Sequence, residues 1–283
     1  MGCDPKRRSP AGGARYHAAV TAEPLTPEDL QALRAARDQL ENPGLTARLA
    51  DLVGTPLEKG LQALPRGAAD RIGAVVDTAL DRCLRLALRT LGPGAPADPS
   101  GRLHKVAAGV SGGLGGFFGL LALPVELPVT TTMMFRSICE IARAAGEDLE
   151  TTEARLQCMS VFALGAGGSR STAHNATETG YFAVRAALAT EMKAALQALS
   201  AGGEQAAKSL LVRLLTLIAR RFSIVVTEQL AAKAIPVVGA ALGAGINVLF
   251  MDHFQGMARA HFTVRRLERR YGTQAVRLAY ENA

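Results

Sequence analysis

Apolar residues recur every three or four positions along most of the chain, which is the spacing of one face of an α-helix. The clearest case is residues 68–91, where Leu80, Leu84 and Leu88 fall on one face and arginines on the other. Only Val129–Thr132 favours a strand, and it is too short to form one. The sequence therefore predicts an all-α protein. The expected helices span 26–42, 45–63, 68–91, 128–145, 152–164, 178–198 and 204–227, then a long helix from beyond Pro236 to Tyr271 and a short one capped by Thr273.

Two long, glycine-rich apolar runs interrupt this pattern, Val106–Phe135 and Ala234–Met251. The first twenty residues of the first run carry no charge, and neither does the whole second run. Gly112 and Gly116 lie four apart, so they share a helical face and allow another backbone to approach closely. Pro124 makes the first run short for an ordinary transmembrane helix. We expect a buried or re-entrant hairpin at the centre of a multi-helix bundle, with the two runs touching each other, a membrane, or both.

Proline and glycine clusters predict the organisation of the chain. The segment from Gly92 to Pro99 has the composition of a linker or long exposed loop, because its prolines and glycines end the preceding helix. The start of the chain has no hydrophobic periodicity and shows no secretory signal. The predicted parts are a disordered basic tail at 1–25, N-terminal helices at 26–92, the linker at 93–100 and a helical core at 101–283.

Composition narrows the class of protein further. Hydrophobic residues make up 48% of the 283 residues but aromatic residues only 5%, with no Trp, which favours closely packed helices. The formal net charge is +7, which suits anionic lipid headgroups, although an arginine-rich composition alone also explains it. No groove-reading motif supports nucleic acid as a partner. The four cysteines include no CxxC pair, so they predict neither a disulfide framework nor a zinc site and favour a reducing compartment.

Glu126 is the most suggestive single residue. It lies between Pro124 and Pro128 inside an apolar stretch, where a carboxylate needs a cationic partner or has its pKa raised by burial. It is a candidate general base, metal ligand or contact for a substrate headgroup. The structural alternatives are that it caps a helix beginning at Pro128 or pairs with an arginine.

The long C-terminal helix carries further candidates for acid–base chemistry. Asp252 and Arg259 are seven residues apart and share a face, whereas His253 and His261 are roughly 12 Å apart along the axis, too far to chelate one metal ion by themselves. His261 also aligns with apolar residues, so a core histidine is the alternative. Catalytic candidates are Glu126, Asp252, His253 and His261; ligand-binding candidates are Arg136, Tyr181, Arg185, Asn247 and Arg259.

Three other patterns are less specific. Gly109–Gly113 reads GxSxG, but a nucleophile elbow needs a preceding strand, which the sequence does not predict here. Tyr181 and Arg185, four apart, can bind a phosphate or carboxylate or can be ordinary contacts between helices. The arginines at 265–270 can face anionic lipid or be a solvated face at the end of a helix. The chain contains no P-loop or dinucleotide fingerprint, and its cofactor requirement stays unknown.

Several separated motifs over roughly residues 100–272 resemble the EcsC protein family. The motifs, in order, are Leu123–Thr131, Arg136–Ile138, Ile141–Arg143, Gly146–Leu149, Val161–Gly165, Gly180–Arg185, Ala234–Gly239, Asn247, Asp252–Phe254, Ala258–Arg259, His261–Phe262 and Leu267–Glu268. The family is named after a protein encoded beside an ABC transporter of the Ecs type. Its own activity is unassigned, so the resemblance implies an architecture and a setting, not a reaction.

Together these features support two functional hypotheses. The first is a bacterial, membrane-associated helical protein, cytoplasmic and peripheral or re-entrant at the inner membrane, that binds a lipid-like molecule and assists an ABC exporter. The second is a hydrolase or lyase acting on an apolar substrate, with Glu126, Asp252, His253 and His261 meeting in one pocket. The geometry of that pocket separates the two.

Overall fold

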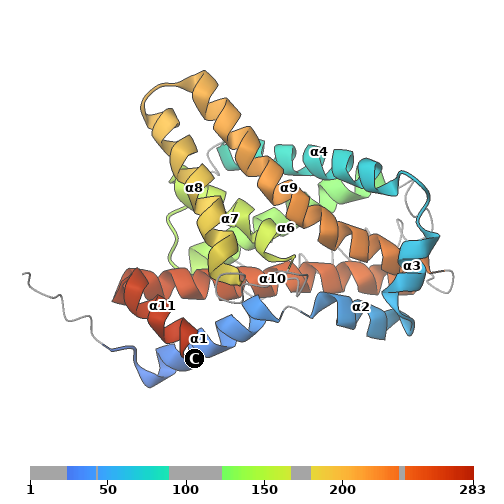
Figure 1. Ribbon diagram of the computed structural model, residues 1–283, viewed down its shortest axis with the longest axis horizontal. Coiled ribbons are helices and arrows are strands. Elements are labelled where there is room, and N and C mark those ends of the chain that lie inside the picture. Colours follow the sequence, from blue (N-terminus) through green and yellow to red (C-terminus); the bar gives the residue numbers. More distant parts are fainter. Residues whose placement is uncertain (1–23, 43, 89–122, 167–179, 236–239) are drawn as a thin grey trace, which may run out of the picture.

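Helix α10 (Ala240–Tyr271) lies at the centre of the structure, between α1 and α2 on one side and α6, α7 and α9 on the other (Figure 1). This computed structural model describes residues 24–42, 44–88, 123–166, 180–235 and 240–283. Within those ranges every regular element is a helix and none is a strand, so the all-α prediction is confirmed. The other elements are α1 (Pro27–Glu41), α2 (Leu45–Val53), α3 (Leu57–Ala63), α4 (Ala68–Leu88), α6 (Leu123–Ala144), α7 (Thr152–Leu164), α8 (Tyr181–Ser200), α9 (Glu204–Ala234) and α11 (Thr273–Glu281).

Several helix ends follow the rules that predict them from sequence. The hydroxyl group of Thr26 accepts a hydrogen bond from the backbone N–H of Asp29, 3.2 Å away, and so caps α1. Gly146 and Gly272 follow α6 and α10 with φ of 83° and 86°, a conformation that residues with a Cβ atom rarely adopt. The last helix differs from the prediction, because Gly272 holds the cap position and Thr273 is already helical.

The structure corrects three other predicted boundaries. The expected helix at 45–63 is two helices, broken at Gly54, where φ is 65°, and at Pro56. Helix α6 begins at Leu123 instead of Pro128, so Pro128 lies inside the helix and Glu126 belongs to its first turn. Helix α9 continues seven residues past the expected end at Thr227, because buried side chains in its last two turns pack into the core and stabilise the helical conformation.

The core is densest around α7, whose last eleven residues are all buried. It contacts α4, α6, α8, α9 and α10. Phe162 of α7, Phe222 of α9, and Phe250 and Phe254 of α10 form one aromatic group, with ring centroids 5.0 to 6.2 Å apart. This group joins the three helices.

The two apolar runs contact each other where both are described. The end of the first run forms the start of α6, and the second run forms the start of α10, which packs against α6. Among the described helices, none combines the length and apolar character needed to cross a membrane. The predicted hairpin at 106–122, the GxSxG match, the linker and residues 1–23 of the tail lie outside the described residues.

Candidate functional site

Glu126 belongs to a buried polar cluster formed by α6, α9 and α10. Its Oε1 atom accepts hydrogen bonds from Lys233 Nζ at 2.5 Å and from Asn247 Nδ2 at 2.8 Å. Asn247 Oδ1 in turn accepts a bond from Gln229 Nε2 at 2.7 Å. The side chains of Lys233 and Glu126 are 3% and 10% exposed, so water screens their attraction little.

This cluster decides between the alternatives for Glu126. The residue does not cap a helix at Pro128, because it is already helical, and its ion-pair partner is a lysine instead of an arginine. Asn247, a ligand-binding candidate from the sequence, donates its side-chain hydrogen bond to Glu126. The carboxylate of Glu126 thus connects α6 to Lys233 of α9 and to Asn247 of α10, which is a structural arrangement between three helices.

Three other candidates lie at or near the surface. Asp252 accepts a hydrogen bond from Arg48 Nη2 of α2 at 2.8 Å and forms an ion pair with this arginine. Arg259 and Arg136 are both exposed, on α10 and α6. The shared face of Asp252 and Arg259 that helical spacing predicts therefore does not produce a carboxylate–guanidinium pair.

His253 is a buried residue bound to a backbone carbonyl. Its Nε2 atom lies 2.7 Å from the oxygen of Gly165, and because a carbonyl only accepts, Nε2 carries the proton. The Nδ1 atom has no hydrogen-bond partner. Burial lowers the pKa of His253 to about 4, since a charged imidazole would lose its hydration there. This histidine is therefore neutral near pH 7.

His261, Tyr181 and Arg185 meet in a second buried cluster, which also includes Glu268. The Tyr181 hydroxyl lies 2.9 Å from His261 Nδ1, and Arg185 Nη1 lies 3.4 Å from that hydroxyl. Arg185 also binds Glu268 through two hydrogen bonds of 2.8 and 2.5 Å. Burial holds the pKa of His261 well below its usual value and raises that of Tyr181. The guanidinium of Arg185 is thus bound to a carboxylate of the protein itself.

The structure does not bring the four catalytic candidates to one site. Asn247, which touches Glu126, and His261 are fourteen residues apart on α10, or about 21 Å along its axis. His253 binds the backbone carbonyl of Gly165, whereas Asp252 binds Arg48. In the described part of the chain, no group of three or more His, Cys, Asp or Glu side chains is placed to hold a metal ion. The geometry therefore does not support the pocket of the enzyme hypothesis.

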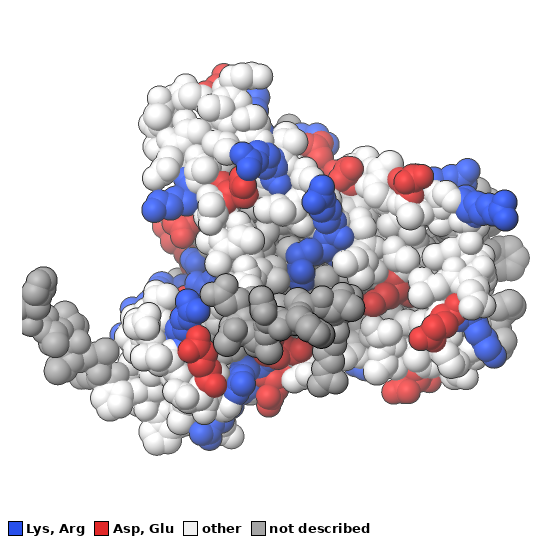
Figure 2. Space-filling view, viewed as in Figure 1, with Lys and Arg blue, Asp and Glu red and all other residues white. Residues whose placement is uncertain are grey.

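The basic end of α10 is engaged by acidic residues of the protein. Glu147 accepts two hydrogen bonds of 2.9 Å from Arg265 and another from Arg269. Burial opposes its ionisation, but these guanidinium groups hold the pKa of Glu147 below its usual value. Arg270 and Tyr271 bind Asp29 of α1 at 3.0 and 2.7 Å. Figure 2 shows basic and acidic side chains interspersed on one face of the molecule. The arginines at 265–270, which the sequence left as either lipid-facing or a solvated face, therefore pair largely with Asp29 of α1 and with Glu147 of the segment between α6 and α7.

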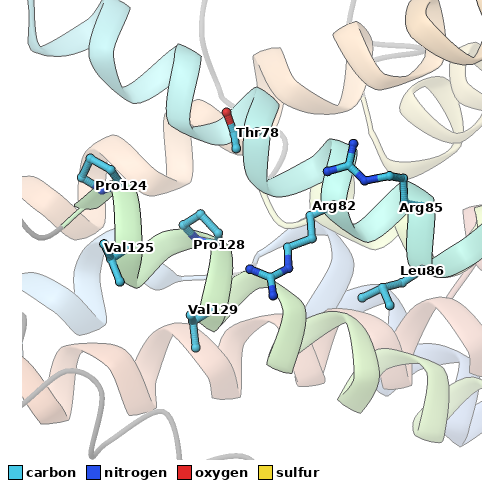
Figure 3. A pocket seen from close by; sticks show the side chains of 8 residues that line it. All are labelled: Thr78, Arg82, Arg85, Leu86, Pro124, Val125, Pro128 and Val129. Carbon is cyan, nitrogen blue, oxygen red and sulfur yellow. The ribbon is translucent and has the colours of Figure 1, made fainter.

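A surface groove of about 680 Å³ lies between α4 and α6. Its α6 wall is apolar, and Val125 and Val129 on it are 73% and 36% exposed. From α4, the long side chain of Arg82 extends toward this wall (Figure 3). Arg85 pairs with Asp81 on its own helix. The described residues that line it are Thr78, Arg82, Arg85, Leu86, Pro124, Val125, Pro128 and Val129.

The sequence model of the EcsC protein family matches residues 28–267. The chain belongs to this family. The match begins in α1, so it includes the N-terminal helices as well as the region around residues 100–272 where the motifs were recognised. No match was found among curated proteins or among solved structures.

Several residues of this EcsC protein that shape the sites were missed from sequence. Lys233, the ion-pair partner of Glu126, was overlooked because it ends a helix that was expected to stop at Thr227. Glu268 had appeared only as part of a family motif, although it binds Arg185. Helical spacing places Arg82 on the polar face of its helix but does not show that it borders a groove. Val125 is exposed although it belongs to an apolar run, a pattern that usually predicts burial.

Proposed function

We propose that this EcsC protein associates peripherally with membranes that contain anionic lipid, through the surface formed by α4 and the start of α6. One observation carries the proposal. Val125 is 73% exposed at the first turn of α6, with Val129 one turn further along the same helix face and two arginines opposite. Apolar side chains that project from a surface beside basic residues suit the boundary between lipid headgroups and acyl chains.

Electrostatics supports the same surface. The formal charge of the chain is +7, which attracts it to an anionic bilayer over a distance of about one Debye length. The arginines at the end of α10 contribute to this general attraction, but they are bound to Glu147 and Asp29. Arg82 makes no ion pair with another described residue, so its charge is available to an anionic headgroup.

Vesicle co-sedimentation tests the proposal. We expect the full chain to bind vesicles of phosphatidylcholine and phosphatidylglycerol, to bind phosphatidylcholine alone more weakly, and to lose affinity as salt increases. The double variant with Asp at both position 125 and position 129 should bind vesicles on the order of tenfold more weakly or worse, because two apolar contacts are lost and two negative charges are added.

Val212 provides a matched control. It is 60% exposed on α9, so Val212→Asp makes the same chemical change on another helix and should leave vesicle binding within about twofold once the charge difference is allowed for. A full chain that stays in the supernatant with anionic vesicles at low salt would refute the proposal. An equal loss of vesicle binding in Val212→Asp and in the double variant at positions 125 and 129 would refute the choice of surface.

The family setting extends this proposal to an ABC exporter as a partner in the same membrane. The support is the family name alone, and photo-cross-linking from position 125 in cells tests it. Adducts with lipid but never with a transporter subunit would contradict this extension.

A further inference from the structure

We infer that the groove between α4 and α6 is a discrete site for one phospholipid molecule with an anionic headgroup, whose phosphate binds Arg82 and whose acyl chain lies along α6. This inference rests on the proposed membrane association and makes it specific, since a discrete site saturates with one ligand whereas general adhesion to a bilayer does not. The volume of about 680 Å³ falls within the range of sites that bind small molecules.

The α6 wall suits an acyl chain because it offers few hydrogen-bonding groups. Pro124, Val125, Pro128 and Val129 have no polar side-chain atom, and the two prolines also lack a backbone N–H. All four line the groove from the first two turns of α6 and are labelled in Figure 3. Contact with an acyl chain would remove the exposed surface of Val125 and Val129 from water.

The α4 wall suits a phosphate of low charge. Arg82 points toward α6, and its planar guanidinium can bind two phosphate oxygens at once. Arg85 keeps hydrogen-bond donors, but Asp81 offsets its charge. The local balance is close to one positive charge, which a phosphodiester monoanion matches better than a dianion does.

The alternative occupant, an acidic peptide, fits the groove less well. A peptide brings backbone N–H and C=O groups, and those against the proline and valine wall would lose water without gaining partners. An acyl chain has no such groups to satisfy. The contrast between the two walls therefore favours an anionic amphiphile with a plain hydrocarbon tail.

Binding of a soluble lipid tests the inference apart from membrane association. Dihexanoyl phosphatidylglycerol, kept below its critical micelle concentration, is titrated into the full chain and followed by calorimetry, with native mass spectrometry to count the bound molecules. We expect one molecule per chain. Dihexanoyl glycerol, which lacks the phosphate, and inorganic phosphate, which lacks the acyl chains, should each bind about tenfold more weakly or not at all.

Two variants localise the site, and each has a control. Arg82→Gln should reduce affinity for dihexanoyl phosphatidylglycerol about tenfold, whereas Arg220→Gln, at an exposed arginine of α9, should not change it. Val129→Trp should fill the groove and abolish binding of the soluble lipid while vesicle binding persists, because Trp itself partitions well into the membrane interface. Circular dichroism confirms that each variant is folded.

The outcomes separate the two claims. Vesicle binding without saturable binding of the soluble lipid overturns the groove site and leaves the proposed function standing. Saturable binding of the soluble lipid without vesicle binding supports the site and overturns membrane association. If the chain binds an acidic amphipathic peptide but does not bind dihexanoyl phosphatidylglycerol, the lipid is overturned as the occupant. Unchanged lipid affinity in Arg82→Gln overturns it as well.

Discussion

The two buried histidines predict that this protein loses stability steeply in mild acid. His253 and His261 are fully buried, and each has one ring nitrogen that bonds to none of the described residues, Nδ1 of His253 and Nε2 of His261. Protonation of His253 would place a second N–H in this buried position, where a charged imidazole loses its hydration. Protonation of His261 would add a charge beside Arg185 and Arg265, which already lower its pKa. Both side chains are therefore neutral imidazoles in the folded protein near pH 7.

The magnitude follows from the difference between folded and unfolded pKa values. The pKa of His253 is about 4 in the folded protein against 6.5 for an unperturbed histidine, so between these values the unfolded state binds more protons. Stability is then fully present above pH 6.5 and falls as pH decreases toward 4. Between pH 7.5 and pH 5, His253 alone accounts for a loss of about 2 kcal/mol.

His261 adds to this loss in the same direction, because burial holds its folded pKa well below 6.5. A loss of about 2 kcal/mol from His253 alone is already a large part of the 5–15 kcal/mol by which ordinary domains are stable. Glu228 acts in the opposite direction, since burial raises its pKa and its protonation in acid restores some stability.

Urea denaturation followed by circular dichroism, from pH 5 to pH 8, measures this dependence. His253→Gln keeps a donor for the Gly165 carbonyl but cannot be protonated, and should remove about 2 kcal/mol of the loss between pH 7.5 and pH 5. His261→Asn, which offers an acceptor to Tyr181, should also make the slope shallower. Glu228→Gln serves as a control that makes the slope steeper. A free energy of unfolding that stays flat from pH 7.5 to pH 5 in the parent chain would refute the reasoning.

Three further predictions concern other buried groups. Lys233→Met should destabilise the protein by about 3 to 5 kcal/mol in the same denaturation assay, because it leaves the Glu126 carboxylate buried without a cation. Adding Glu126→Gln to this variant should recover much of the lost stability, and no recovery would show that the two residues are not coupled. Glu147→Gln should cost about 3 kcal/mol at pH 7 and progressively less as the pH falls below 4.5, since the pKa of Glu147 is lowered from that value and its contribution is lost as the pH falls toward the folded pKa. A cost that does not decrease below pH 4.5 would contradict this. In a Cys3→Ser chain, Ellman's reagent should label no thiol quickly until denaturant is added and three thereafter, because the described cysteines are all buried: Cys83, Cys139 and Cys158.

The sequence was sufficient for features that depend on neighbours along the chain. Helical periodicity, the Thr26 cap and the glycine after α10 are determined within a few residues, and the structure agrees with each of them. The break at Gly54–Pro56 was also visible as a glycine followed by a proline, but apolar periodicity on both sides obscured it. Local signals thus predicted the helices well and their boundaries less well.

The candidate sites depended on contacts between distant residues, which periodicity does not reveal. The residues of the Glu126–Lys233 ion pair are 107 positions apart in the sequence, and those of the Glu147–Arg265 ion pair are 118 positions apart. A helix pattern shows that a charged residue leaves the apolar face, but not whether it meets solvent or the acid of another helix. Arg185 illustrates this, because its spacing from Tyr181 was recognised while Glu268, which binds its guanidinium, was not assigned.

The start of α6 combines a buried ion pair with exposed apolar side chains, and helical geometry explains how both arise there. Val125 and Val129 are four residues apart and share the groove face, whereas Glu126 is rotated by about 100° from Val125 and reaches Lys233 in the core. A buried pair such as this one adds little net stability, because desolvation opposes it, but it strongly disfavours positions of α6 that separate the charges. The pair therefore fixes the orientation in which Val125 and Val129 stay exposed, although the hydrophobic effect alone would favour turning them inward. This explains why an apolar surface persists beside the α4 arginines, and why rotation of α6 in a Lys233→Met chain should reduce vesicle binding as well as stability.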